Sequence, residues 1–201
     1  MAPAIRTGRE AMSPDESCRL ALAEPVRLVP YDSRWPACFD AERERVMGCI
    51  GSHLVHVCHF GSTAVPGMAA KPTIDIIAGL RDMAIVDQVL QRLCEHGYSH
   101  APELDLGAPE RRFLFRHADG HRTHHLHLVA FDASTWRERI RFRDLLRSDP
   151  RLRASYAALK RELAARHQGD RDAYTRGKAE FIRGALTSAG EVPGAVRSIP
   201  C

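Results

Sequence analysis

The chain has 201 residues and a formal net charge of +4, with 44% hydrophobic and 27% charged residues. This composition suits a folded domain with its own core and excludes a compositionally disordered protein. The sequence has no apolar run of the roughly 18 residues that a membrane-spanning helix needs, and residues 1–24 lack the apolar stretch of a secretory signal.

The first part of the chain is predicted to alternate between helix and strand. We expect a flexible leader over residues 1–24 and then a helix that begins near Ser33 and ends at Ile50. Residues 54–60 and 73–78 are predicted strands, and the second strand is almost entirely apolar, as in a strand buried on both faces. Residues 61–71 form a loop of small residues between them.

The remainder is predicted to be a hairpin between helices. Asp82 caps a helix that ends at Gly97, and residues 111–117 and 122–130 form a hairpin around a turn at Gly120. Helices follow over about 133–147, 150–167 and 170–186, and residues 188–201 are expected to be a flexible tail. The predicted fold class is α+β: a small mixed sheet with flanking helices in residues 25–131, and a helical lobe in residues 132–187 packed on it.

The loop between the first two strands carries residues suited to phosphate chemistry. Gly61 would let a ligand approach the backbone closely, and Ser62 offers a hydroxyl and an N–H to a phosphate. Asp75 on the next strand is placed to hold a metal ion, and Lys71 is the nearest cation. The loop is neither a P-loop nor a dinucleotide-binding G-x-G-x-x-G motif. On spacing alone, an ordinary turn followed by a buried, hydrogen-bonded aspartate explains the same residues.

Five of the eleven histidines fall between residues 117 and 127. On a strand, His125 and His127 point to one face, whereas His124 points to the other. With Asp75 they would form a site of two histidines and one carboxylate, which suits a transition metal better than magnesium. Two other roles stay open: hydrogen bonding or acid–base work at a phosphate, and a structural role.

The predicted C-terminal helices carry two tyrosine–lysine pairs, each on a single helix face: Tyr156 with Lys160, and Tyr174 with Lys178. These helices would wall a cleft with lysines that meet phosphates and a tyrosine that stacks on a base. The alternative is aromatic core packing, with the lysine stems lying along it. The arginine-rich run 137–153 is likewise either a solvated helix face or an electropositive wall.

Gly61-Ser62 followed by a hydrophobic–Asp–hydrophobic strand resembles the opening signature of nucleotidyltransferase-fold enzymes. The longer string GSTAVPGMAAKPTIDI resembles the GrpB family motif, and Arg112-Phe113, the histidine strand and the helical segments extend this resemblance over residues 26–186. The resemblance implies a nucleotidyltransferase-type sheet that binds a nucleoside triphosphate, with ATP expected first, and a divalent metal, either Mg²⁺, Mn²⁺ or Zn²⁺. One departure is Ile77, which stands where members of the superfamily that transfer nucleotides present a second carboxylate beside Asp75.

These patterns define two sets of candidate residues. The candidate catalytic and metal-binding residues are Asp75, His125 and His127. The candidate nucleotide-binding residues are Gly61, Ser62, Thr63, Lys71, Arg112, Tyr156, Lys160 and Lys178.

The leading hypothesis is a nucleotide- and metal-dependent transferase that acts on a small-molecule acceptor by nucleotidyl transfer or adenylate-type activation. The alternatives are an ATP-dependent, ligase-like amide synthesis, an inactive nucleotide-binding accessory module, and a metal hydrolase built on histidine and aspartate. No nucleic-acid or membrane partner is expected, because the sequence has no stripe of interleaved aromatic and basic residues. The six cysteines form no C-x-x-C pair and are expected to be free thiols of a cytoplasmic protein.

Overall fold

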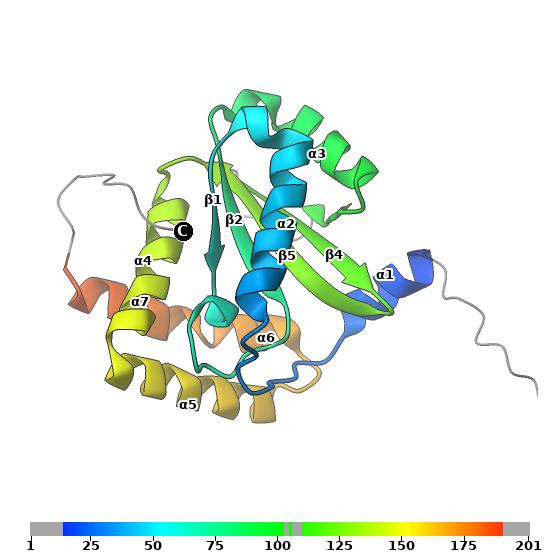
Figure 1. Cartoon of the computed structure of the whole chain (residues 1–201). Helices are drawn as coiled ribbons and strands as arrows, with labels where there is room; N and C mark the ends of the chain where they lie inside the picture. The colour runs from blue at the N-terminus through cyan, green and yellow to red at the C-terminus, as the bar shows by residue number, and fades with distance from the viewer. Residues whose placement is uncertain (1–13, 103–104, 106–109, 191–201) are drawn as a thin grey trace, which may run out of the picture.

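A five-stranded mixed sheet forms the centre of the computed structural model, which describes residues 14–102, 105 and 110–190 (Figure 1). Its strand order is β1-β2-β5-β4-β3. Strands β2 and β5 pair in parallel, and the other neighbours pair antiparallel. The strands are β1 (Leu54–Phe60), β2 (Ile74–Leu80), β3 (Ser99–His100), β4 (Arg111–Ala118) and β5 (His121–Ala130). The predicted α+β class, a small mixed sheet with flanking helices, is confirmed.

Seven α-helices surround the sheet in the part of the chain that the structure describes. They are α1 (Pro14–Ala23), α2 (Trp35–Ile50), α3 (Val86–Glu95), α4 (Ser134–Ser148), α5 (Pro150–Arg166), α6 (Arg171–Arg176) and α7 (Ala179–Ser188). The predicted helix 170–186 is broken into α6 and α7 at Gly177, where an added Cβ would meet Leu163 at 2.6 Å. A larger residue at this position would therefore require the Leu163 side chain of α5 to move.

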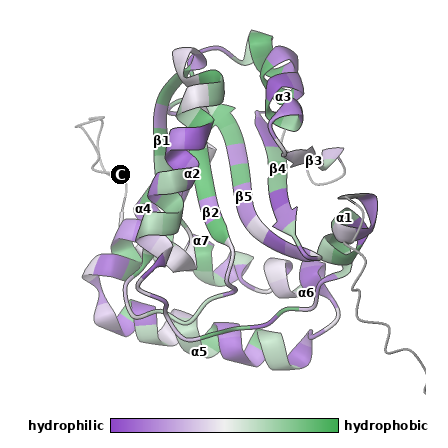
Figure 2. Cartoon of the chain, turned by 45° about the vertical axis from the view of Figure 1, so that its right-hand side comes forward, coloured by the Kyte–Doolittle hydropathy of each residue, from purple (hydrophilic) through white to green (hydrophobic). Residues whose placement is uncertain are grey.

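The two faces of the sheet are covered by different helices. Ile76 and Ala78 of β2 pack in the core under α2 and α3, whereas Ile77 packs with Trp136 and Ile140 of α4 on the other face. Figure 1 shows α2 crossing one face of the sheet. Figure 2 shows that β2 is largely apolar, as a strand covered on both faces must be. Strand β2 is thus buried on both faces, as its apolar sequence predicts.

The segment expected to be a flexible leader contains α1, which packs on the β4–β5 hairpin. The Ser17 hydroxyl lies 2.9 Å from His117 Nδ1 and accepts a hydrogen bond from the Gly120 N–H at 3.0 Å. Arg122 Nε donates to the Ala21 carbonyl at 3.1 Å. The prediction is therefore wrong for residues 14–23, because small and polar side chains fix this helix where an apolar repeat would normally do so.

None of the described helices is both long and apolar enough to span a membrane. Four of the cysteines are free thiols, as expected: Cys18, Cys38, Cys49 and Cys94. Cys58 is fully buried in β1.

Candidate functional site

The turn that follows β1 is shaped by its contact with Asp75. Gly61 adopts φ 71° and ψ −168°, a conformation that strains any residue with a side chain. A Cβ added at Gly61 would lie 2.5 Å from Asp75 Oδ2. Ser62 then opens a short 3-10 turn, Ser62–Ala64. The glycine in the motif is thus required by the close approach of this turn to the carboxylate of β2.

Side chains from α4 and β1 hold the turn from behind. Arg143 of α4, almost fully buried, donates to the His59 carbonyl at 2.9 Å, and Arg147 donates to the Ala64 carbonyl at 2.9 Å. His59 Nε2 lies 2.9 Å from the Thr63 hydroxyl. Two arginines of the basic run therefore brace the loop, and the loop geometry is set before any ligand arrives.

Asp75 forms a hydrogen-bonded pair with His125. The two residues are register partners in the parallel β2–β5 pair, and His125 Nδ1 lies 2.9 Å from Asp75 Oδ1. Burial alone would raise the pKa of Asp75, but the hydrogen bond from His125 and the charge of Lys71 hold that pKa below its usual range. Burial lowers the pKa of His125 to about 4. At neutral pH the pair is therefore an ionised carboxylate and a neutral imidazole.

His127 lies two residues further along β5 and is packed between aromatic side chains. Its ring centroid is 5.1 Å from Phe60 of β1 and 5.1 Å from Phe113 of β4, and both rings meet it edge-on. Burial, with the charge of Arg139, holds the pKa of His127 well below its ordinary value. His125 and His127 share one sheet face, as their spacing predicts.

Three lysines from separate segments converge beside this pair. Lys160 of α5 is buried and donates to the Ser62 hydroxyl at 2.9 Å and to the Ala69 carbonyl at 2.6 Å. The ammonium of Lys178 lies 4.4 Å from the Tyr174 ring centroid, and that of Lys71 lies 6.0 Å from the same centroid.

The lysines lie in an environment that disfavours their positive charge. Burial and neighbouring cations lower the pKa of Lys71 to about 7 and that of Lys160 to about 7, and burial lowers the pKa of Lys178 to about 8. Within the described ranges, no ion pair joins these three ammonium groups to a carboxylate. The Asp75 carboxylate is the anion that acts on all three through space, and a further anion in direct contact would stabilise their charged forms.

A wide cleft joins these groups into one site. Its lining includes Gly61, Ser62, Asp75, His125, His127 and the three lysines. Basic residues outnumber acidic ones along it, and Arg122, Arg139 and Arg171 contribute besides the lysines. The convergence of Arg139 and Arg171 on this cleft is not evident from the sequence, although Arg139 belongs to the basic run 137–153.

The structure places the side chains of two predicted nucleotide-binding residues, Arg112 and Tyr156, differently from the expectation. Arg112 pairs with Leu128 on the α2 side of the sheet, so its side chain leaves the site, and Arg111 lines the cleft instead. Tyr156 packs in the core with its ring 5.1 Å from Phe142 and 5.3 Å from Phe181. Tyr156 also lines the cleft, with the Lys160 ammonium 5.3 Å from its ring centroid, so base stacking by Tyr156 stays a prediction.

The comparisons with known proteins agree with the motif. The family model described as GrpB protein matches residues 25–188. The chain belongs to the GrpB family. The Glutamate-rich protein GrpB of Alkalihalophilus pseudofirmus is 34% identical over 159 residues, which cover 78% of this chain and 91% of that protein. The crystal structure of conserved protein GrpB from Enterococcus faecalis aligns with a TM-score of 0.71 and 29% identity, covering 82% of this chain and 100% of that one.

One relative is considerably longer than the matched region. The UPF0157 protein YqkA of Bacillus subtilis is 35% identical over 164 residues, which cover 82% of this chain and 47% of YqkA. The chain therefore spans about half the length of that GrpB-family relative.

The cleft offers few side chains that could bind a metal ion. Ile77, on the same strand face as Asp75, is fully buried and supplies no carboxylate. No three His, Cys, Asp or Glu side chains among the described residues are grouped closely enough to hold a metal ion. Asp75, His125 and His127 line one cleft, but Asp75 accepts a hydrogen bond from His125, and the three are not assembled as a coordination sphere. The predicted metal set does not fit this geometry.

Proposed function

We propose that this chain binds the phosphates of a nucleoside triphosphate and transfers a nucleotidyl group from it to a small-molecule acceptor. ATP is the nucleotide we expect first. The observation that carries the proposal is that Lys160 donates to the Ser62 hydroxyl, while Lys71 and Lys178 line the same cleft beside the Tyr174 ring. The lysine pKa values stay lowered although the Asp75 carboxylate acts on all three from beyond ion-pair distance, so a polyphosphate would stabilise the charged ammonium groups.

The phosphate end of the nucleotide is placed by the turn. Lys160 already holds the Ser62 hydroxyl at 2.9 Å, so a phosphate oxygen beside that hydroxyl meets an ammonium and an O–H together. Lys71 and Lys178, both near the Tyr174 ring, supply further positive charge as negative charge develops on the leaving pyrophosphate. The lysines therefore provide electrostatic stabilisation from the chain itself.

Transfer forms a bond from an acceptor oxygen or nitrogen to the α-phosphorus and breaks the bond from that phosphorus to the bridging oxygen. Pyrophosphate leaves with that oxygen and takes up the proton that an alcohol or amine acceptor loses. An acceptor carboxylate would give an adenylate, which is the first step of ligase-like amide synthesis. The Asp75–His125 pair lines the same cleft as the lysines, and we assign it to the acceptor side.

Product analysis tests this proposal. The purified chain is incubated with ATP, GTP, CTP and UTP, with Mg²⁺, with Mn²⁺ and with neither, and with a pool of small alcohols, amines and carboxylates. Pyrophosphate release with an acceptor mass increased by a nucleotide monophosphate is expected. Nucleotide binding without pyrophosphate release in any mixture would favour the accessory-module hypothesis, and hydrolysis that needs metal but no nucleotide would favour the hydrolase.

A further inference from the structure

Two buried histidine nitrogen atoms in the cleft lack partners. His125 Nε2 and His127 Nδ1 are inaccessible to solvent and have no hydrogen-bond partner, although both residues line the cleft. Their side chains are 6% and 8% exposed. Buried polar atoms in proteins are satisfied in the large majority of cases, so an unpartnered pair at a cleft wall points to a ligand that completes them.

The chemistry of His125 Nε2 follows from its other nitrogen. Nδ1 lies 2.9 Å from Asp75 Oδ1, and an ionised carboxylate can only accept, so Nδ1 carries the ring proton. Burial, opposed by Asp75 but reinforced by the charges of Lys71 and Arg171, lowers the pKa of His125 to about 4, and the imidazole is neutral at pH 7. Nε2 then bears a lone pair and acts only as an acceptor of hydrogen bonds.

The surroundings of Nε2 are aromatic. The Phe113 ring centroid lies 5.1 Å from the rings of both His125 and His127, and Phe60 lies 5.1 Å from His127. The charges of Lys71 and Arg171 act on His125 and that of Arg139 acts on His127, but no described lysine or arginine donates a hydrogen bond to either free nitrogen, and Phe60 and Phe113 line the cleft beside them. A group that reaches Nε2 must therefore bring apolar surface with its polar atom.

We propose that His125 Nε2 binds the acceptor substrate, and that this substrate is an alcohol or amine that donates an O–H or N–H from an apolar, ring-sized body. The assignment rests on the proposed transfer reaction and narrows its acceptor class. A carboxylate acceptor is disfavoured because its oxygen lone pairs would face the lone pair of Nε2. Asp75 acts as the positioning residue that fixes the ring tautomer.

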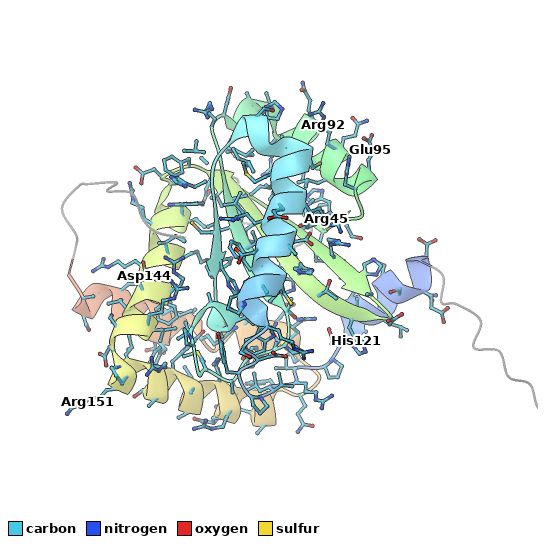
Figure 3. All side chains as sticks on the ribbon, viewed as in Figure 1. Arg45, Arg92, Glu95, His121, Asp144 and Arg151 are labelled. Atoms are coloured by element: carbon cyan, nitrogen blue, oxygen red, sulfur yellow. The ribbon has the colours of Figure 1, made fainter. Side chains whose placement is uncertain are left out.

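Probe binding tests the assignment without any turnover. Benzyl alcohol and benzylamine carry a donor on an aromatic body, whereas benzyl methyl ether has nearly the same body and no donor. Each is titrated into ¹⁵N-histidine-labelled protein, with and without ATP, while the ring nitrogen resonances are followed by NMR. His121, exposed at the tip of the hairpin in Figure 3, is the internal control.

The donor probes are expected to shift the His125 Nε2 resonance and to bind at least about tenfold tighter than the ether, because a buried acceptor left unpaired disfavours the ether complex. Equal affinity for the ether, or a protonated Nε2 in the free protein at pH 7, would overturn the assignment. ATP binding is measured separately by calorimetry. Donor-selective probes without ATP binding would overturn only the proposed reaction, and ATP binding without donor selectivity would overturn only this inference.

A tautomer variant gives a second, independent readout. In Asp75→Asn the amide can donate to Nδ1, which moves the ring proton to Nε2 and turns it into a donor. The preference for benzyl alcohol over the ether is then expected to be lost or reversed. Unchanged donor selectivity in a folded Asp75→Asn protein contradicts the role of Asp75, and if the variant does not fold, the wild-type probe series still decides the proposal.

Discussion

Replacing Lys160 with methionine should make the unliganded protein more stable and remove its response to nucleotide. The pKa of Lys160 falls from 10.5 to about 7, chiefly through burial. A pKa change of one corresponds to about 1.36 kcal/mol, so at pH 7 the buried amine costs the folded state on the order of 4 kcal/mol. The substitution also removes the hydrogen bonds to Ser62 and Ala69, worth about 1 kcal/mol each.

The net expectation is a gain of about 1–2 kcal/mol in the free energy of unfolding at pH 7. For a chain of this size, each kcal/mol raises Tm by about 2–4 °C. Because the folded pKa of Lys160 lies below its unfolded value, the unfolded chain binds more protons between about pH 7 and pH 10, and wild-type stability rises with pH in this window. The advantage of Lys160→Met should therefore shrink as the pH rises from 7 to 9. Urea unfolding at several pH values measures this difference.

The second measurement compares how much bound nucleotide stabilises the wild type and each variant. A ligand at 100 times its Kd stabilises the wild type by about 2.7 kcal/mol, and this gain should be largely lost in Lys160→Met. Arg161→Met, an exposed neighbour on the same helix, is the matched control and should change stability by less than about 0.5 kcal/mol. A Lys160→Met protein that is less stable than wild type at pH 7, yet keeps its full response to nucleotide, would refute the reasoning and assign Lys160 a structural role.

Two further predictions concern the turn and the lysines. Gly61→Ala should destabilise the fold by about 1–3 kcal/mol and abolish nucleotide binding, because its Cβ would collide with Asp75. Gly67→Ala shares a positive φ but has no atom within 4 Å of the added Cβ, so in the same assays it should show the backbone strain alone and keep nucleotide binding. Nucleotide affinity should fall as pH rises from about 7 to 9, because phosphates bind the protonated lysines. Calorimetry in buffers of different ionisation enthalpy should show proton uptake on binding, and a pH-independent affinity without uptake would mean that these lysines do not meet the phosphates.

The parts of the fold that sequence could predict are those encoded by local patterns. The apolar run of β2 and the hairpin turn at Gly120 are local signals, and both elements form where expected. The nearness of Gly61 to Asp75 also follows locally, because a short loop joins the two strands. Helix α1 was missed because its contacts with the hairpin come from residues about 100 positions away, including Ser17 with His117.

The site was only partly predictable for the same reason. Alternation along β4 fixes Arg111 and Phe113 on one face, but only the pairing of Phe113 with His127 shows that this face is the cleft side and that Arg112 leaves it. The hydrogen bond between Lys160 and Ser62 joins residues that are 98 positions apart. No local pattern encodes that contact, nor the bracing of the loop by Arg143.

Calorimetric titration with ATP, GTP, CTP and UTP tests the central claim most directly, using the wild type, Lys160→Met and Arg161→Met, each with and without Mg²⁺. The account predicts that the wild type and Arg161→Met bind at least one triphosphate with uptake of protons at pH 8, and that Lys160→Met binds it at least about tenfold more weakly, since charged hydrogen bonds contribute about 1.5–3 kcal/mol. The absence of binding to all four nucleotides at millimolar concentration, or equal binding by Lys160→Met, would contradict it.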